Sequence, residues 1–522
     1  MTNSFDLVIN NARIIDGTGT AASHGSVGVR DGRIAAVAET ELAGATTIDA
    51  QRQVLAPGFI DLHSHADFSV GANPEAVTQV SQGVTTLLTG NCGTSPFPVK
   101  DLEALKGATS FLRPALAWDW QDAAGFADRL KASRTAVNIA LQVGHSALRL
   151  AVLGDEQRAP TASELGQMQD LLRQAADQGV RGYSTGLIYA PCSYARTDEI
   201  TAMAQTAAEC GLLYSTHMRN ETDRLIEAVD EAIRVARATG VRLEISHIKA
   251  MGPRNHGKVA EALDRMADAR SEGLDVAADV YPYTASSTTL TSRLPDWGLD
   301  GGGAALLKRL EDPSERRRLS HALALRFDGE IDPAGIVLAS LPEGKYTPWI
   351  GFSLTEVGQA MELSPHETAL DILAEHRASV AIVNHAMVDD DVQTALKDPF
   401  VSVASDGWVM TASGTGNPHP RSFGTFTRVL GHYVRALGTL SLEEAIRKMT
   451  SLPASRAGLQ DRGAIRPGLV ADLVIFDPDA VTDHSTYAEP WQLSSGISQV
   501  LVAGETAYKD GSPTDMRMGQ VI

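Results

Sequence analysis

The stretch Phe59-Ile-Asp-Leu-His-Ser-His-Ala-Asp67 decides which fold and which chemistry we expect. A mostly apolar run with a Pro-Gly break leads into it from Val54, as is typical where a chain enters a buried parallel strand. Side chains alternate between the two faces of a strand, so His63 and His65 point the same way and can reach one metal ion. The stretch predicts a metal site at the end of a barrel strand, with two surface histidines on an edge strand as the alternative.

Length, charge and cysteine usage limit the classes of protein and partner. The 522 residues suffice for one α/β barrel with an accessory domain. A formal net charge of -19 argues against nucleic acid and anionic membrane surfaces, so the expected partner is a small molecule. Three widely spaced cysteines, Cys92, Cys192 and Cys210, indicate a reducing compartment. With no signal-peptide pattern and no apolar window of membrane-spanning length, we expect a cytoplasmic protein.

The two ends of the chain share one pattern. Residues 1–57 and 460–522 read as short alternating strands separated by turn residues, and we expect them to form one small β-sandwich domain. Residues 58–459 alternate strands with helices, which predicts a parallel (β/α)8 TIM-like barrel of the metal-dependent hydrolase type. The rhythm breaks over residues 288–350, where glycines, prolines and a charged helix indicate an insertion or lid near the active site.

The expected barrel has one strand too many. Eight strands suffice, yet the pattern offers nine, and it does not show which is surplus. With the first strand at residues 59–62, the others are expected at 84–88, 137–143, 180–183, 212–215, 241–245, 274–278, 380–383 and 400–403.

Ligand-type side chains follow these strands repeatedly. The carboxyl ends of barrel strands gather at one face, where active sites lie. In chain order they carry His63 and His65, Cys92, His145, His217, His247, Tyr281, His385 and Asp406. Imidazole, thiolate and carboxylate ligands with an open position describe a catalytic zinc site. The set is large enough for two metals bridged by Cys92, or for one tightly held ion and one weaker site.

Longer motifs around these residues resemble the amidohydrolase superfamily and, within it, the N-acyl-D-amino-acid deacylase (D-aminoacylase) family. A cysteine at position 92, where most relatives have a carboxylated lysine or a glutamate, is the discriminating mark. The resemblance covers nearly the whole chain and rests on the motifs Pro57-Gly-Phe-Ile-Asp-Leu-His-Ser-His65, Gly90-Asn-Cys-Gly93, Gly182-Tyr-Ser-Thr-Gly-Leu187, Thr216-His-Met-Arg-Asn-Glu221, Ser246-His-Ile-Lys249, Asp279-Val-Tyr-Pro-Tyr-Thr284, Ser405-Asp-Gly407 and His419-Pro-Arg-Ser-Phe-Gly-Thr-Phe426.

The resemblance implies a role for each ligand. It implies that the tightly bound zinc is held by Cys92, His217 and His247. It implies that the second, weaker site shares Cys92 and adds His63, His65 and Asp406. Asp406 would also take a proton from the attacking water and pass it to the leaving nitrogen.

The resemblance also implies residues for the substrate. The α-carboxylate would be held by Lys249, Tyr281, Ser287 and Arg421, which suits a buried carboxylate because guanidinium, ammonium and hydroxyl groups are its natural donors. Arg293 lies where the substrate side chain could be recognised. It would pair with an acidic side chain or, as the alternative, form a salt bridge within the lid.

The expected activity is zinc-dependent hydrolysis of N-acyl-D-amino acids to a carboxylate and a free D-amino acid. Two alternatives stay open. One is a cyclic amidase of the dihydroorotase or hydantoinase type, although no lysine stands at a strand end in the role that such enzymes need. The other is a relative that has lost its metals and serves as a scaffold, which the intact set of ligand residues disfavours.

Overall fold

The computed structural model describes residues 5–110 and 116–522. At its centre eight parallel strands form a nearly closed barrel, in the order β16-β12-β11-β10-β9-β8-β7-β6. This architecture confirms the predicted barrel fold. The strands are β6 (Phe59–Asp61), β7 (Val84–Thr89), β8 (Asn138–Gly144), β9 (Gly182–Gly186), β10 (Leu213–His217), β11 (Arg242–Ile245), β12 (Val276–Val280) and β16 (Val401–Val403).

The barrel closes at the predicted metal site. No strand ladder among the described residues joins β6 to β16, but the segments that follow these strands are bonded to each other. The backbone N–H of Asp406 donates to the carbonyl of His63 over 2.8 Å, and the N–H of His65 donates to the carbonyl of Gly407 over 2.8 Å. These two hydrogen bonds therefore fix the positions of His63, His65 and Asp406 relative to one another.

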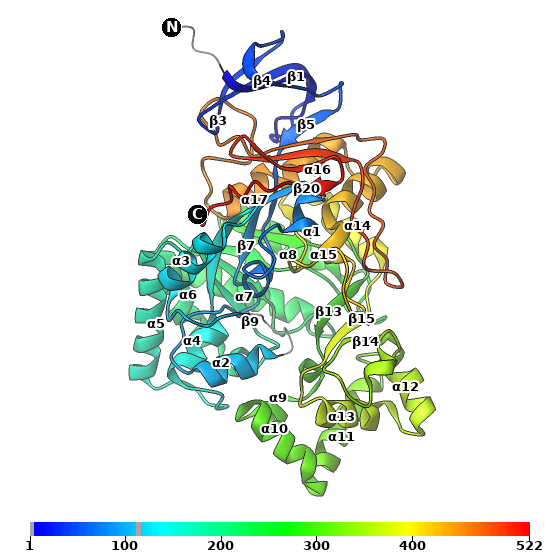
Figure 1. Cartoon of the computed structure of the whole chain (residues 1–522). Coiled ribbons are helices and arrows are strands. Elements are labelled where there is room, and N and C mark those ends of the chain that lie inside the picture. The colour runs from blue at the N-terminus through cyan, green and yellow to red at the C-terminus, as the bar shows by residue number, and fades with distance from the viewer. Residues whose placement is uncertain (1–4, 111–115) are drawn as a thin grey trace.

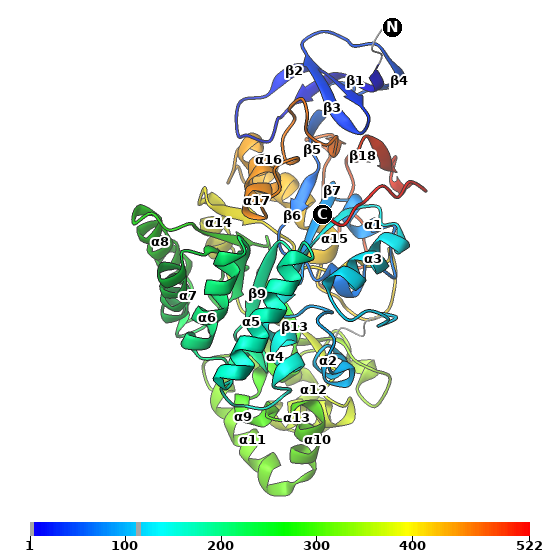
Figure 2. The same cartoon turned by 90° about the vertical axis from the view of Figure 1, so that its left-hand side faces the viewer.

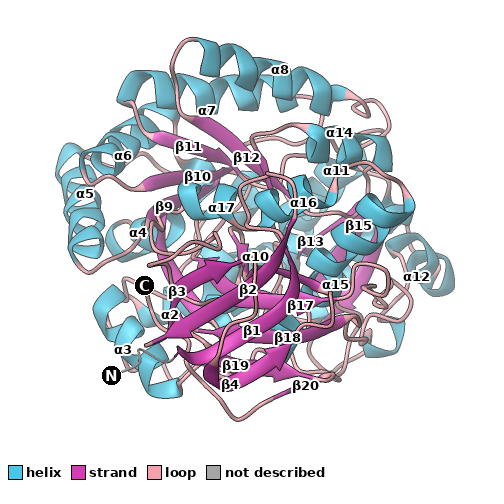
Figure 3. Cartoon of the chain, turned by 90° about the horizontal axis from the view of Figure 1, so that it is seen from above, coloured by secondary structure: helices cyan, strands magenta, loops and turns pink. Residues whose placement is uncertain are grey.

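Helices surround the barrel strands, as the view from above shows (Figure 3). A capping box of Thr161 and Glu164 begins α5, where each side chain bonds the other residue's backbone N–H. These helices are α1 (Val77–Val80), α2 (Leu102–Ala108), α3 (Ala123–Ser133), α4 (His145–Val152), α5 (Ala162–Asp177), α6 (Thr197–Glu209), α7 (Leu225–Thr239), α8 (Lys258–Ser271), α14 (Asp389–Lys397), α15 (Arg421–Arg428), the π-helical η7 (Val429–Ala436), α16 (Leu442–Met449) and α17 (Ser451–Arg456).

The two ends of the chain meet in one nine-stranded sheet. Strand β5 joins them, because it pairs with β1 on one side and antiparallel with β17 on the other. The strands are β1 (Phe5–Ile14), β2 (Ser23–Arg30), β3 (Arg33–Ala38), β4 (Gly44–Asp49), β5 (Val54–Pro57), β17 (Leu473–Phe476), β18 (Ile497–Val502), β19 (Glu505–Lys509) and β20 (Ser512–Pro513). The predicted common β unit of the chain ends is therefore present, while the domain boundaries at 57 and 460 stay a prediction.

A separate unit lies between β12 and β16, at the end of the molecule opposite the N-terminal strands (Figures 1 and 2). Its antiparallel strands pair in the order β13-β15-β14 beside an apolar cluster of their own. The predicted insertion, residues 288–350, falls here, but its boundaries stay a prediction. The elements are β13 (Ala285–Thr289), η4 (Leu290–Arg293), α9 (Asp296–Leu299), α10 (Gly302–Glu311), α11 (Pro313–Phe327), β14 (Ile336–Ser340), α12 (Leu354–Met361), α13 (Pro365–Glu375) and β15 (Ala381–His385).

Strand β15 is the surplus ninth strand of the sequence pattern. The run at residues 380–383 is apolar and buried like a barrel strand, yet β15 pairs with β13 and β14. His385 consequently ends a strand of this outer sheet and not of the barrel. Across the described ranges, no helix has the length and apolar character needed to cross a membrane.

Candidate metal centre

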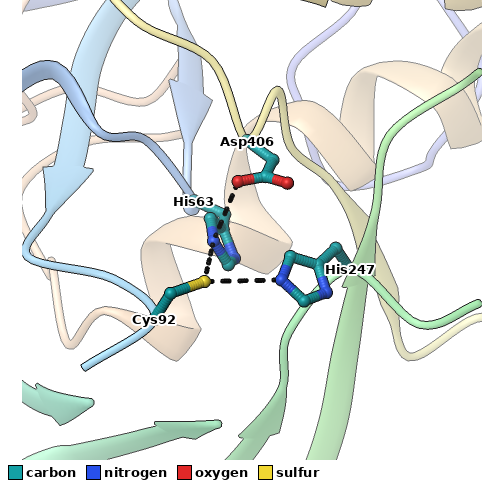
Figure 4. Close-up of side chains that lie close together, drawn as sticks. All are labelled: His63, Cys92, His247 and Asp406. Carbon is teal, nitrogen blue, oxygen red and sulfur yellow. Dashed lines mark hydrogen bonds and ion pairs between the residues drawn. The ribbon is translucent and has the colours of Figure 1, made fainter. Parts of the chain in front are cut away.

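Four predicted ligands converge at the carboxyl ends of the barrel strands (Figure 4). The Cys92 Sγ lies 3.3 Å from His63 Nε2 and 3.4 Å from His247 Nε2, and His63 Nε2 lies 3.4 Å from Asp406 Oδ1. One ligand atom from each residue lies within 4.8 Å of the others, and all four side chains are buried. The segments after β6, β7, β11 and β16 supply them, as the strand-end argument predicted.

The backbone is turned unusually at three of these positions. Cys92, His247 and Asp406 have φ angles of 53°, 38° and 51°, in the left-handed region that non-glycine residues seldom adopt. Such conformations cost free energy and concentrate at functional sites. Here they aim three side chains at one point directly after their strands end.

The two remaining predicted ligands border this group. His217 Nδ1 lies 3.6 Å from Cys92 Sγ, and His217 forms a second cluster of possible ligand atoms with Glu221 and His247. His65 Nε2 lies 3.0 Å from Asp406 Oδ1. All six residues are therefore neighbours, while the division into a tight and a weak site stays a prediction.

The electrostatics of the cluster suit a cation. Burial lowers the pKa of His63 and of His247 to about 3, so both rings are neutral, which is the form that binds metals. Burial raises the pKa of the Cys92 thiol well above its usual range, so a thiolate there requires a cation beside it. Burial opposes ionisation of Asp406, but the Arg421 guanidinium beside it favours the charged form, and the pKa of Asp406 lies well below the ordinary value.

Three of the predicted substrate residues lie together, because Ser287 and Tyr281 both contact Arg421, which binds Asp406. The guanidinium of Arg421 donates to Asp406 Oδ2 over 2.6 Å and to the carbonyl of Ser287 over 3.2 Å. The guanidinium of Arg421 also lies over the ring of Tyr281, 5.2 Å from its centroid. The hydroxyl of Tyr281 is buried and has no hydrogen-bond partner among the residues that the structure describes. An unsatisfied donor here is available to a substrate.

The other two predicted substrate residues, Lys249 and Arg293, do not contact Arg421. The Lys249 ammonium lies behind His247, where it donates to Glu221 Oε1 over 2.5 Å and to the His247 carbonyl over 2.8 Å. Its predicted contact with a substrate carboxylate stays a prediction. Arg293, in η4, is buried and forms no ion pair within the described ranges, so the alternative salt bridge in the lid is not seen. Burial lowers the pKa of Arg293 to about 10.

Two cavities meet at the cluster. One, of about 430 Å³, is lined by Cys92, His247, Asp406 and Arg421, and it extends toward α2 and α10. The other, of about 260 Å³, shares Asp406 and Arg421 and continues past Trp408. Asp406 and Arg421 line both cavities, so these two side chains stand where the cavities meet.

Sequence reasoning assigned no role to two carboxylates that touch the ligands. Asp279, in β12, lies 3.3 Å from His63 Nδ1 and accepts the backbone N–H of His247 over 2.7 Å. Glu221 lies at ion-pair distance from His217, His247 and Lys249. The available signals were that Asp279 directly follows a predicted strand and that Glu221 stands four residues after His217, but their contacts depend on packing between elements.

His145, which also follows a barrel strand, serves elsewhere. Its ring is buried between the Tyr183 hydroxyl at 2.7 Å and Glu199 at 2.9 Å, and Arg149 also binds Glu199. His145 belongs to neither cluster of possible metal ligands. This network is part of the buried core and lies apart from the candidate metal ligands.

Comparison with known proteins identifies the family. The model of the amidohydrolase family matches residues 46–309 and 354–508. An N-acyl-D-aspartate deacylase of Alcaligenes xylosoxydans xylosoxydans is 38% identical, covering 99% of this chain and 95% of the relative. An N-acyl-D-glutamate deacylase of the same organism is 36% identical, covering 100% and 97%. The chain is an amidohydrolase of the N-acyl-D-amino-acid deacylase family.

A solved structure agrees with this family in fold. The N-acyl-D-glutamate deacylase of Bordetella bronchiseptica, crystallised with zinc and a phosphonate mimic of the tetrahedral intermediate, has a TM-score of 0.85 at 35% identity and covers 99% of both chains. The donor set of this amidohydrolase fits such a metal, because thiolate, imidazole and carboxylate are zinc ligands. It is a metal-dependent enzyme of that family.

Proposed function

We propose that this enzyme hydrolyses the amide bond of N-acyl-D-amino acids, with zinc, to a carboxylate and a free D-amino acid. The observation that carries the proposal is the convergence of His63, Cys92, His247 and Asp406 where two cavities meet. The full-length relatives named as deacylases support this substrate class and the D configuration. They also favour linear amide hydrolysis over a cyclic amidase, and the complete donor set disfavours a metal-free scaffold.

Zinc bound at this cluster would supply the positive charge that polarises the amide carbonyl and makes water more acidic. We propose one tightly held ion on Cys92, His217 and His247, and a second, weaker site that adds His63, His65 and Asp406. The buried, neutral imidazoles of His63 and His247 and the closely spaced donor atoms support both sites.

Asp406 carries the proton in the proposed reaction. Its carboxylate is ionised, so it can accept a proton from the attacking water and return it to the nitrogen of the departing amino acid. His65 and Arg421 hold its two oxygens at 3.0 Å and 2.6 Å, which fixes the orientation of the carboxylate. Burial of Asp406 keeps bulk water from competing for the proton.

The same surroundings provide for the substrate. We propose that Arg421, Ser287 and Tyr281 bind the α-carboxylate, with Lys249 as the fourth group predicted from the sequence. The buried, unsatisfied Tyr281 hydroxyl supports this. We propose that Arg293 attracts an acidic side chain, since its Nε is buried and unsatisfied within the part of the chain that the structure describes. The cytoplasmic location and the exclusion of nucleic acid partners also stay proposals, supported by three free cysteines and the net charge.

A paired panel of N-acetyl-D- and N-acetyl-L-amino acids, with apolar and acidic side chains, tests the proposal. Zinc-loaded enzyme is expected to release free amino acid from D members and not from their L counterparts. Failure to cleave any D member at high enzyme concentration would contradict the proposed function.

A further inference from the structure

Glu221 lies behind the metal ligands, on the side away from Cys92. It is 4% exposed and follows β10 in the segment that begins with His217. Its Oε2 lies 3.5 Å from His217 Nε2, and its Oε1 lies 3.3 Å from His247 Nδ1. The opposite nitrogen of each ring, His217 Nδ1 and His247 Nε2, faces the Cys92 sulfur at 3.6 Å and 3.4 Å. One carboxylate therefore touches the back of two rings whose fronts face the same thiol.

The state of each ring depends on this contact. A ring that binds a metal through one nitrogen carries its proton on the other, and that N–H needs an acceptor. His217 Nε2 is buried and has no hydrogen-bond partner in the described ranges, so the nearby carboxylate is what favours a proton there. Glu221 thus selects the tautomer in which each histidine offers its lone pair to the side of Cys92.

Lys249 also depends on the Glu221 carboxylate. Its Nζ lies 2.7 Å from His247 Nδ1 and 2.5 Å from Glu221 Oε1. When His247 binds a metal through Nε2, its Nδ1–H and the ammonium are both donors and repel each other at this distance. The Glu221 oxygen accepts from both and makes the close approach possible. The ammonium lies this close to two of the three members of the second cluster, Glu221 and His247, so we take the cluster as support for the metal centre and not as a further metal site.

We propose that Glu221 is a positioning residue for the metal centre. It orients His217 and His247 toward the ion and anchors Lys249, although it contacts neither ion nor substrate. The effect of Glu221 on catalysis rests on the proposed function. Its consequence for metal binding is independent of which substrate the enzyme takes.

The test compares Glu221→Gln with Glu199→Gln. Glu199 is a matched control, because it is also 4% exposed and also binds a histidine and a cation, His145 and Arg149, but it touches none of the predicted metal ligands. Zn²⁺ affinity is measured on folded, metal-free protein by competition with a chromophoric chelator. The loss of an outer carboxylate partner typically weakens metal binding about 10-fold to 100-fold. We expect that loss in E221Q and wild-type affinity in E199Q.

Wild-type affinity in E221Q, or an equal loss in both variants, would overturn the proposal. Should E221Q not fold, Glu221→Asp makes the same test, because it keeps the charge but withdraws it by one methylene group. It is expected to bind Zn²⁺ more weakly than wild type, and unchanged affinity would overturn the proposal.

Activity provides a second readout that separates the two proposals. Excess Zn²⁺ is expected to restore kcat of E221Q toward the wild-type value, because the defect is loss of the ion and not of a reacting group. A variant that is fully loaded yet as slow as before would contradict a positioning role. If wild type itself cleaves no N-acyl-D-amino acid while its Zn²⁺ affinity still depends on Glu221, the proposed function fails and the positioning role stands.

Discussion

Replacement of Asp406 by Asn separates its chemical role from its structural one. Asn keeps the shape of the side chain but cannot accept and return a proton. General acid–base catalysis contributes about 100-fold to 10,000-fold, so kcat/KM is expected to fall by that factor, or by about 3–5 kcal/mol of transition-state free energy. The assay is release of free D-amino acid by protein with a verified zinc content.

The same substitution carries a cost in stability. Asp406 is 6% exposed, and its bond of 2.6 Å to Arg421, which is 3% exposed, would lose its charge and leave a buried guanidinium without its anion. Breaking a buried ion pair costs about 3–5 kcal/mol. Denaturant unfolding of metal-free D406N is expected to show a loss of that order. The carboxylate has a folded pKa below its unfolded value, so its contribution is present above the unfolded pKa and is lost as the pH falls through the folded pKa.

Asp472→Asn is the matched control. Asp472 binds Arg462 at the same distance, 2.6 Å, and both side chains are 4% exposed, but this pair lies outside the metal centre. D472N is expected to lose comparable stability while its folded fraction keeps the wild-type kcat/KM. The reasoning is refuted if zinc-loaded D406N is as active as wild type, or if D472N loses activity to the same extent.

Three further results are expected. Cys92→Ser replaces the proposed thiolate ligand with a hydroxyl. In calorimetry, Zn²⁺ should raise the melting temperature of wild type but not of this variant. An equal shift in both proteins would remove Cys92 from the ligand set. Gly186→Ala would place a Cβ against the carbonyl oxygen of Cys92, so the Cys92 backbone must move. The variant should retain less zinc after dialysis, and its free energy of unfolding should fall by about 1–3 kcal/mol. Wild-type zinc content would contradict this. Burial lowers the pKa of Lys448 to about 8, so the unfolded chain binds this proton more tightly, and the free energy of unfolding should rise between about pH 8 and the ordinary lysine pKa. In urea titrations at several pH values, Lys448→Met should remove that rise. An identical pH profile in both proteins would rule out the lysine as its source.

The sequence was sufficient for the barrel and for the ligand-type side chains that cluster at one of its ends, while their role as metal ligands stays a prediction. Parallel barrel strands end at one face, so reading the residue after each strand found His63, Cys92, His247 and Asp406 without any distance information. The chain ends could be joined for a similar reason, since both carried the same short alternating pattern.

Other features depended on pairings that the pattern does not contain. The run that forms β15 is as apolar as a barrel strand, and only its antiparallel partners show that it belongs to the outer sheet. His145 has the position of a ligand, but Tyr183 and Glu199 surround its ring. Glu221 reaches its partners through the turn after β10, which places a carboxylate between two histidines 30 residues apart in a way that spacing alone does not reveal.

The measurement that tests the central claim most directly follows bound zinc and activity together. Metal-free enzyme is titrated with Zn²⁺ while hydrolysis of an N-acetyl-D-amino acid that it accepts and the zinc retained per chain are recorded on the same samples. Activity should be absent at the start and should rise with the first bound ion. Full activity in the metal-free enzyme, or zinc-loaded enzyme that cleaves no D substrate, would contradict a zinc-dependent D-deacylase.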